Sequence, residues 1–242
     1  MNTSQHQITV ASFTIDVVRK DIKNMHLAVY PPNGRIRIAA PLHIDDDAVR
    51  MFAISKIAWI KKQQAKFARQ ERQTAREYIT GESHYFQGRR YLLNIVHTTG
   101  RPAVKICNKT YLDLYVQPDS TTQQRERQLT EWYRRQLKAI IPDLVEKWQK
   151  IIGVEIAAWG VKKMKTKWGT CNHETRRIWL NLELAKKSRR CLEYIIVHEL
   201  VHLLERRHNE TFIAYMDQFM PNWRLHKEEL NRAPLGHVEW GY

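Results

Sequence analysis

The most informative stretch of this 242-residue sequence reads Tyr194-Ile195-Ile196-Val197-His198-Glu199-Leu200-Val201-His202-Leu203-Leu204. Between Ile195 and Leu204 the only polar residues are His198, Glu199 and His202, so a helix here would be apolar at nearly every angle and therefore buried. Two imidazoles and a carboxylate in such a place cost several kcal/mol unless they are hydrogen-bonded, charge-paired or bound to a metal. His198 and His202 lie one helical turn apart on one face, so both can reach a single cation.

This spacing is the H-E-x-x-H pattern, in which the two histidines hold zinc and the glutamate acts as a base toward water. His208 follows His202 by six residues and can supply the third protein ligand of a catalytic zinc. It reaches the metal only if the helix ends near the charged run Glu205-Arg206-Arg207, with Asn209 capping the next helix. The alternative is a pair of core histidines and a surface histidine without a metal.

Composition restricts the class of protein. The chain is 43% hydrophobic, which allows one large domain or two small ones with real cores. It has no run of 18 apolar residues and no signal-peptide pattern at its start, so we expect a soluble, cytoplasmic protein. Three scattered cysteines do not form a disulfide framework. The net charge of +15 favours contact with polyanions such as nucleic acid, although basic residues on solvated helix faces would give the same charge.

The first half of the chain is predicted to be rich in β-strands. Residues 8–40 and 84–116 alternate between apolar and polar in the manner of strands, with a hairpin turn at Pro31-Pro32-Asn33-Gly34. Between them, a helix capped by Asp45-Asp46-Asp47 is expected from about residue 45 to residue 76. The polar tract 117–124 resembles a linker, which places a domain boundary near residue 120.

The second half is predicted to carry the chemistry. A long amphipathic helix, with Pro142 as a candidate kink, is expected to follow residue 124. A hairpin ending in the strand Arg177–Leu182 precedes the histidine helix. Extended peptide substrates commonly pair with an exposed sheet edge, and the strand around Trp179 is our candidate for that edge. Residues 162–190 hold ten Lys or Arg and two Glu, including Lys162, Lys163, Lys165 and Lys167.

Several motifs together resemble one known family. They are Trp168-Gly169-Thr170-Cys171, Ile178-Trp179-Leu180-Asn181, Tyr194 to His202, His208 and Phe212, and they are similar to the YgjP-like metal-dependent hydrolases, zincin-type metallopeptidases related to the WLM and SprT groups. The resemblance departs slightly at Thr170, where serine is usual, and at Ile213, where an aromatic residue is common. The six-residue step to His208 also matches metzincins, but Glu205 stands where they carry glycine.

The resemblance implies an α+β fold with a zincin-like catalytic domain over residues 121–242, preceded by a β-rich N-terminal domain over residues 1–120. It also implies one catalytic Zn²⁺ with His198, His202 and His208 as ligands and Glu199 as the catalytic residue. A further donor to the oxyanion is usual in such sites, and Tyr215 and His226 are candidates.

The leading hypothesis is therefore a zinc-dependent peptidase acting on a peptide or protein substrate. A second hypothesis is a DNA-associated role, either a protease acting on proteins bound to nucleic acid, as the likeness to SprT enzymes implies, or a binding module without turnover. A third is a zinc hydrolase of a non-peptide amide or ester, which would share the metal chemistry.

Overall fold

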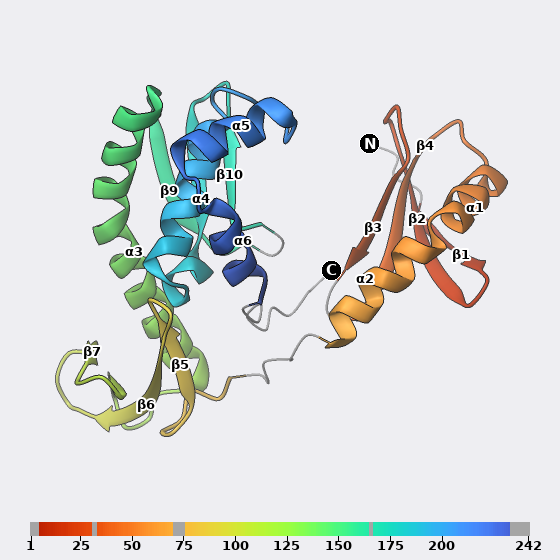
Figure 1. Cartoon of the computed structure of the whole chain (residues 1–242). Helices are drawn as coiled ribbons and strands as arrows, with labels where there is room; N and C mark the ends of the chain where they lie inside the picture. The colour runs from red at the N-terminus through yellow and green to blue at the C-terminus, as the bar shows by residue number, and fades with distance from the viewer. Residues whose placement is uncertain (1–4, 31–32, 70–75, 165–166, 233–242) are drawn as a thin grey trace. The chain divides into compact units, whose positions relative to one another are not determined.

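The computed structural model describes residues 5–30, 33–69, 76–164 and 167–232 (Figure 1). The chain divides into two compact units, Met1–Arg72 and Gln73–Tyr242, and each has its own hydrophobic core. The described part of the chain forms six α-helices, one 3₁₀ helix and three small sheets. The fold is therefore of the mixed α+β class, as the sequence predicts.

The N-terminal unit is a four-stranded sheet with two helices packed on it. Its strands, in the spatial order β1-β2-β4-β3, are β1 (Gln5–Val10), β2 (Phe13–Lys20), β3 (His26–Tyr30) and β4 (Arg35–Pro41). Alternate side chains such as Ile15 and Ile38 are fully buried, because one face of the sheet packs on α1 (Asp46–Ser55) and α2 (Ile57–Arg69).

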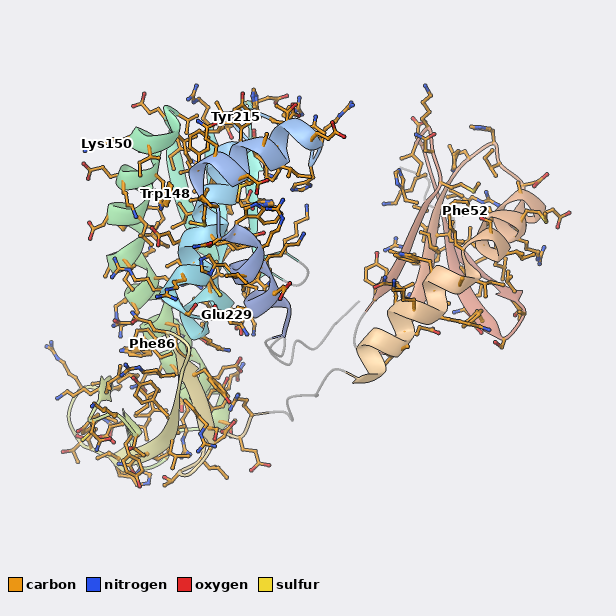
Figure 2. The ribbon with its side chains drawn as sticks, viewed as in Figure 1. Phe52, Phe86, Trp148, Lys150, Tyr215 and Glu229 are labelled. Atoms are coloured by element: carbon orange, nitrogen blue, oxygen red, sulfur yellow. The ribbon has the colours of Figure 1, made fainter. Side chains whose placement is uncertain are left out.

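The helix expected over residues 45–76 is two shorter helices. Asp45 caps α1 as predicted, accepting a hydrogen bond from the Ala48 backbone N–H at 2.8 Å. The helix ends at Ser55, whose hydroxyl donates to the carbonyl of Phe52 at 2.7 Å (Phe52 is labelled in Figure 2). Such side-chain bonds to the backbone bend helices. The second helix ends at Arg69, and residues 70–75 of the expected helix lie outside the described residues.

The second unit begins with a four-stranded sheet of spatial order β5-β6-β8-β7. Its strands are β5 (Ser83–Phe86), β6 (Arg89–His97), β7 (Ala103–Ile106) and β8 (Tyr111–Val116). They are followed by α3 (Thr122–Ile152), the longest helix described, which runs through Pro142. Thr121 and Gln124 form a capping box at its start, so the polar tract 117–124 is a short connection and a helix cap.

The expected domain boundary near residue 120 is corrected by contacts between the β5–β8 sheet and α3. The Phe86 ring lies 4.7 Å from that of Trp132 on α3, at the junction visible in Figure 2. The Tyr133 hydroxyl donates to the Tyr85 carbonyl at 2.8 Å, and the Gln128 amide donates to carbonyls of β7 and β8. One hydrophobic core therefore joins the β5–β8 sheet to the rest of the second unit.

A three-stranded sheet follows α3, with the spatial order β10-β11-β9. Its strands are β9 (Ala158–Lys162), β10 (Gly169–Asn172) and β11 (Arg177–Asn181), and β11 pairs antiparallel with β10 and parallel with β9. The prediction that the Trp179 strand is a sheet edge is therefore wrong, because β11 is central. A Cβ added to Gly160 would lie 2.4 Å from the Trp179 ring, so this tryptophan packs against its neighbouring strand.

The remaining elements surround α4 (Arg189–Val201). They are the 3₁₀ helix η1 (Leu182–Lys186), α5 (Glu210–Phe219) and α6 (Trp223–Arg232). Helix α4 packs against α3, where the Trp148 indole N–H donates to the Glu193 carboxylate at 2.8 Å (Trp148 is labelled in Figure 2), and against β10, α5 and α6. Among the described residues no helix is both long enough and apolar enough to cross a membrane.

Candidate active site

The H-E-x-x-H segment lies at the end of α4 and is buried as predicted. Ile196, Val197 and Leu200 are fully buried and Glu199 is 4% exposed, whereas His198 and His202 are half-buried. Helix α4 ends at Val201, and His202 is its C-cap. The histidine pair therefore sits where a buried helix meets a surface turn.

The turn after α4 brings the following residues back alongside the end of α4. The Leu203 and Leu204 N–H groups donate to carbonyls three residues earlier, which tightens the helix end. The Glu205 carboxylate accepts from the Arg207 backbone N–H at 2.9 Å. Asn209 then caps α5 by accepting from the Phe212 N–H at 3.0 Å, as the sequence predicts. This geometry places His208 beside His198 and His202.

The three imidazoles converge. Candidate ligand atoms of His198, His202 and His208 all lie within 4.8 Å of one another, and the Nε2 atoms of His198 and His208 are 3.0 Å apart. Phe212 lies against all three rings, at centroid distances of 4.7 to 4.9 Å. The His202 Nδ1 is 3.1 Å from the Glu205 carbonyl oxygen, which fixes the ring orientation and leaves Nε2 for another partner.

The charge state of these rings suits metal binding. Burial, with smaller contributions from the neighbouring imidazoles and Lys227, lowers the pKa of His198 to about 3, and burial also lowers the pKa of His202. Both rings are therefore neutral near pH 7 and keep a lone pair. The His198 Nδ1 is buried and has no hydrogen-bond partner among the described residues. With His208, the two rings form a set of three imidazoles that fits a catalytic zinc.

Glu199 lies against the first residue of β10. A Cβ added to Gly169 would lie 2.5 Å from the Glu199 Oε1 and 2.8 Å from its Cγ, so only glycine leaves room for this carboxylate. Burial raises the pKa of Glu199 to about 8, and the positive charge of Lys167 opposes that rise. The close approach of Gly169 is not readable from the sequence, where the residue is only part of a motif.

A cleft of about 720 Å³ opens onto these side chains. Its walls come from β10 with its flanking residues, from α4, from the turn after α4 and from α6. The lining residues are Lys167, Trp168, Gly169, Thr170, Cys171, Asn172, His173, Glu174, Tyr194, Ile195, His198, Glu199, His202, Arg206, His208, Lys227 and Leu230.

The buried side chain of Asn181 supports the wall in front of β10. Its amide nitrogen donates to the carbonyls of Met164 and Lys167 at 3.0 and 2.8 Å. Its oxygen accepts from the backbone N–H groups of Met164 and Glu183 at 3.3 and 3.2 Å. All its hydrogen-bonding capacity is directed to the backbone, so Asn181 fixes the approach to Gly169.

Neither of the oxyanion donors suggested by the sequence, Tyr215 (labelled in Figure 2) and His226, lines the cleft. Tyr194 and Lys227 do. The Tyr194 ring stacks on Trp223 at 6.3 Å and meets His198 edge-on at 5.9 Å, and burial raises the pKa of its hydroxyl to about 12, so the hydroxyl is a neutral donor. No pattern in the sequence indicates Lys227, because it reaches the cleft only through the packing of α6 on α4.

Comparison with known proteins identifies a family for this chain. The family model of the YgjP-like metallopeptidase domain matches residues 23–233. Among solved structures, the chain is similar to the metallopeptidase zymogen abylysin of Pyrococcus abyssi, with 23% identity and a TM-score of 0.35 over 38% of this chain and 90% of that one. It is also similar to the zymogen jannalysin of Methanocaldococcus jannaschii, with 22% identity and a TM-score of 0.34 over 37% of this chain and 92% of that one.

A search of curated proteins finds no match. The family match covers most of the sequence, including α4 and the turn that follows it. The chain therefore belongs to the YgjP-like metallopeptidase-domain family and is a metal-dependent hydrolase that acts as a peptidase.

Proposed function

We propose that this peptidase uses one Zn²⁺ held by His198, His202 and His208, with Glu199 as its general base. The observation that carries the proposal is the convergence of three imidazoles beside a buried carboxylate on the wall of a large cleft. Family membership supports a peptide or protein substrate. The same arrangement supports a zincin-like active site built on α4.

Each residue then has a separate task. When bound, zinc supplies polarisation of the substrate carbonyl and lowers the pKa of water toward about 7. Glu199 accepts the proton of the attacking water and delivers it to the departing amine. Glu199 follows the proposed ligand His198 in the sequence, so a cation bound there would favour the ionised form of Glu199, which burial alone disfavours. Tyr194 and Lys227 are the cleft donors available to the developing oxyanion.

The substrate backbone is proposed to bind along β10. This strand lies at an edge of its sheet in the described part of the chain, and all of its residues line the cleft. An extended peptide can add to such an edge through main-chain hydrogen bonds. Since Gly169 touches Glu199, a peptide paired with β10 would pass directly over the proposed base.

Metal analysis of purified variants tests the zinc site. We expect about one zinc per wild-type chain and its loss from His198→Ala, His202→Ala and His208→Ala. His173→Ala is the matched control, because His173 lines the cleft but is not part of the three-histidine group, and it should keep its zinc. If the double variant His198→Ala/His202→Ala retains stoichiometric zinc, the proposed site is wrong.

The base is tested by Glu199→Gln, which keeps the shape of the side chain and removes its basicity. This variant should retain zinc and lose activity by about 10² to 10⁴-fold. Retained activity in a zinc-loaded Glu199→Gln protein would contradict the role of Glu199. Hydrolysis of non-peptide amides or esters in preference to every peptide tested would favour the third hypothesis over a peptidase.

A further inference from the structure

The cleft is lined by cations that, within the part of the chain that the structure describes, form no ion pair. Lys167 precedes β10, Arg206 lies in the turn after α4 and Lys227 lies on α6, and all three side chains are exposed. Among the described residues none of them is in an ion pair. The carboxylates that line the cleft are Glu174, which is exposed, and Glu199, which is buried.

Other cations of the same unit are neutralised locally. Lys147 pairs with Glu193, Lys150 with Glu146 and Lys186 with Glu183, each at 2.7 Å. In the cleft, by contrast, three separate elements place positive charges on one concave surface. Charges lining a cleft with low-dielectric walls focus the field and attract ligands of the opposite sign.

Two of these cations share the cleft wall with the proposed reacting centre, because Lys167 and Lys227 line the same cleft as His198 and Glu199. Their charges therefore lie inside the substrate cleft. A carboxylate on a substrate residue close to the bond to be cut would be attracted, and a lysine or arginine there would be repelled.

We propose that the cleft selects acidic peptide segments, with Asp or Glu side chains within about two residues of the scissile bond, and that Arg206 and Lys227 determine this preference. Cleavage of such segments rests on the proposed function, whereas their binding does not. A peptide is favoured over other polyanions because the edge strand β10 lines the same cleft and offers main-chain donors and acceptors that only a polypeptide backbone matches in register.

The test compares two fluorogenic peptides of equal length that differ only in carrying Glu or Gln at two positions flanking the cleaved bond. For the zinc-loaded full chain we expect kcat/KM to be at least about ten-fold higher for the Glu peptide, and raising NaCl from about 50 to about 300 mM should reduce that ratio. The double variant Arg206→Gln/Lys227→Gln should reduce the ratio to about three-fold or less.

A matched control removes the same charge elsewhere. Arg135 and Lys138 are exposed on α3 and do not line the cleft, so Arg135→Gln/Lys138→Gln should leave the Glu-to-Gln ratio unchanged. An equal fall of the ratio in both double variants would mean that net charge, not the cleft, is responsible, and would overturn the assignment to Arg206 and Lys227.

Binding is measured separately with zinc-loaded Glu199→Gln protein and the same peptides carrying a fluorescent label. Charge-selective binding without any cleavage by the wild type would refute the proposed function and support the cleft inference. Cleavage with equal kcat/KM for both peptides would do the reverse. Displacement of the Glu peptide by a single-stranded oligonucleotide at about ten-fold lower concentration than by unlabelled Glu peptide would overturn the inference in favour of a nucleic-acid site.

Discussion

Gly169→Ala is the substitution for which the structure makes its sharpest prediction. The new methyl group would lie 2.5 Å from the Glu199 Oε1, 2.8 Å from its Cγ and 2.9 Å from its Cδ. Rotation of the carboxylate alone does not relieve this overlap, because the Cγ near the root of the side chain is also too close. Either the whole side chain of Glu199 or strand β10 must move.

The size of the movement sets the size of the effect. Restoring an ordinary contact of about 3.4 Å requires a displacement of about 1 Å, and misplacing a catalytic group by that distance can cost about 10²-fold in rate. We therefore expect kcat to fall about 100-fold, equivalent to about 2.7 kcal/mol in the activation free energy. Zinc content should not change, since the three atoms nearest to the added Cβ all belong to Glu199 and none belongs to the three imidazoles.

The assay is steady-state peptide hydrolysis alongside zinc analysis and thermal unfolding of the same preparations. Gly100→Ala is the control, because Gly100 lies in a turn where the nearest atom to an added Cβ is the Thr98 Oγ1 at 3.3 Å, and its kinetics should match the wild type. A folded, zinc-loaded Gly169→Ala protein whose kcat is within about three-fold of the wild type would refute the reasoning, since Glu199 would then not need its present position.

Two further predictions concern stability. Burial lowers the pKa of His84 to about 4, so the stability that its neutral form contributes is complete above about pH 6.5 and is lost as the pH falls toward 4. In His84→Phe this pH-dependent loss, on the order of 3 kcal/mol in the unfolding free energy measured with urea, should be absent. Identical pH dependence of the unfolding free energy in both proteins would argue against this. Asn181→Ala should lower the unfolding free energy by about 3 kcal/mol by leaving buried backbone groups unpaired, whereas Asn172→Ala on the exposed end of β10 should cost about 1 kcal/mol or less.

The arrangement of the histidines could be anticipated from the sequence because the relevant signals are local. The apolar run around His198 predicts a buried helix, and the Asn209 cap predicts the turn that returns His208 to it. Burial and turns depend on residues within a few positions of one another. The structure brings the three imidazoles together, while the bound metal and the role of Glu199 stay predictions.

What could not be anticipated depends on contacts between distant segments. The sequence does not indicate that β11 pairs in parallel with β9. Because of that pairing, the Trp179 strand is the central strand of its sheet and not an edge strand. The polar tract before α3 resembles a linker, yet Phe86 and Trp132 pack across it. The location of Lys227 in the cleft likewise follows from helix packing, which sequence periodicity does not encode.

The length of α3 has a practical consequence for dividing the protein. At 1.5 Å per residue its 31 residues extend about 46 Å, and its two halves serve as a common backing for the β5–β8 sheet and for α4. A fragment that starts at residue 121 would lack the β5–β8 sheet that covers the first half of α3. Leu129, Trp132 and Tyr133 would then be exposed to water, at a cost on the order of 2 kcal/mol each. The smallest piece that keeps the helix covered therefore begins before β5, at about residue 76.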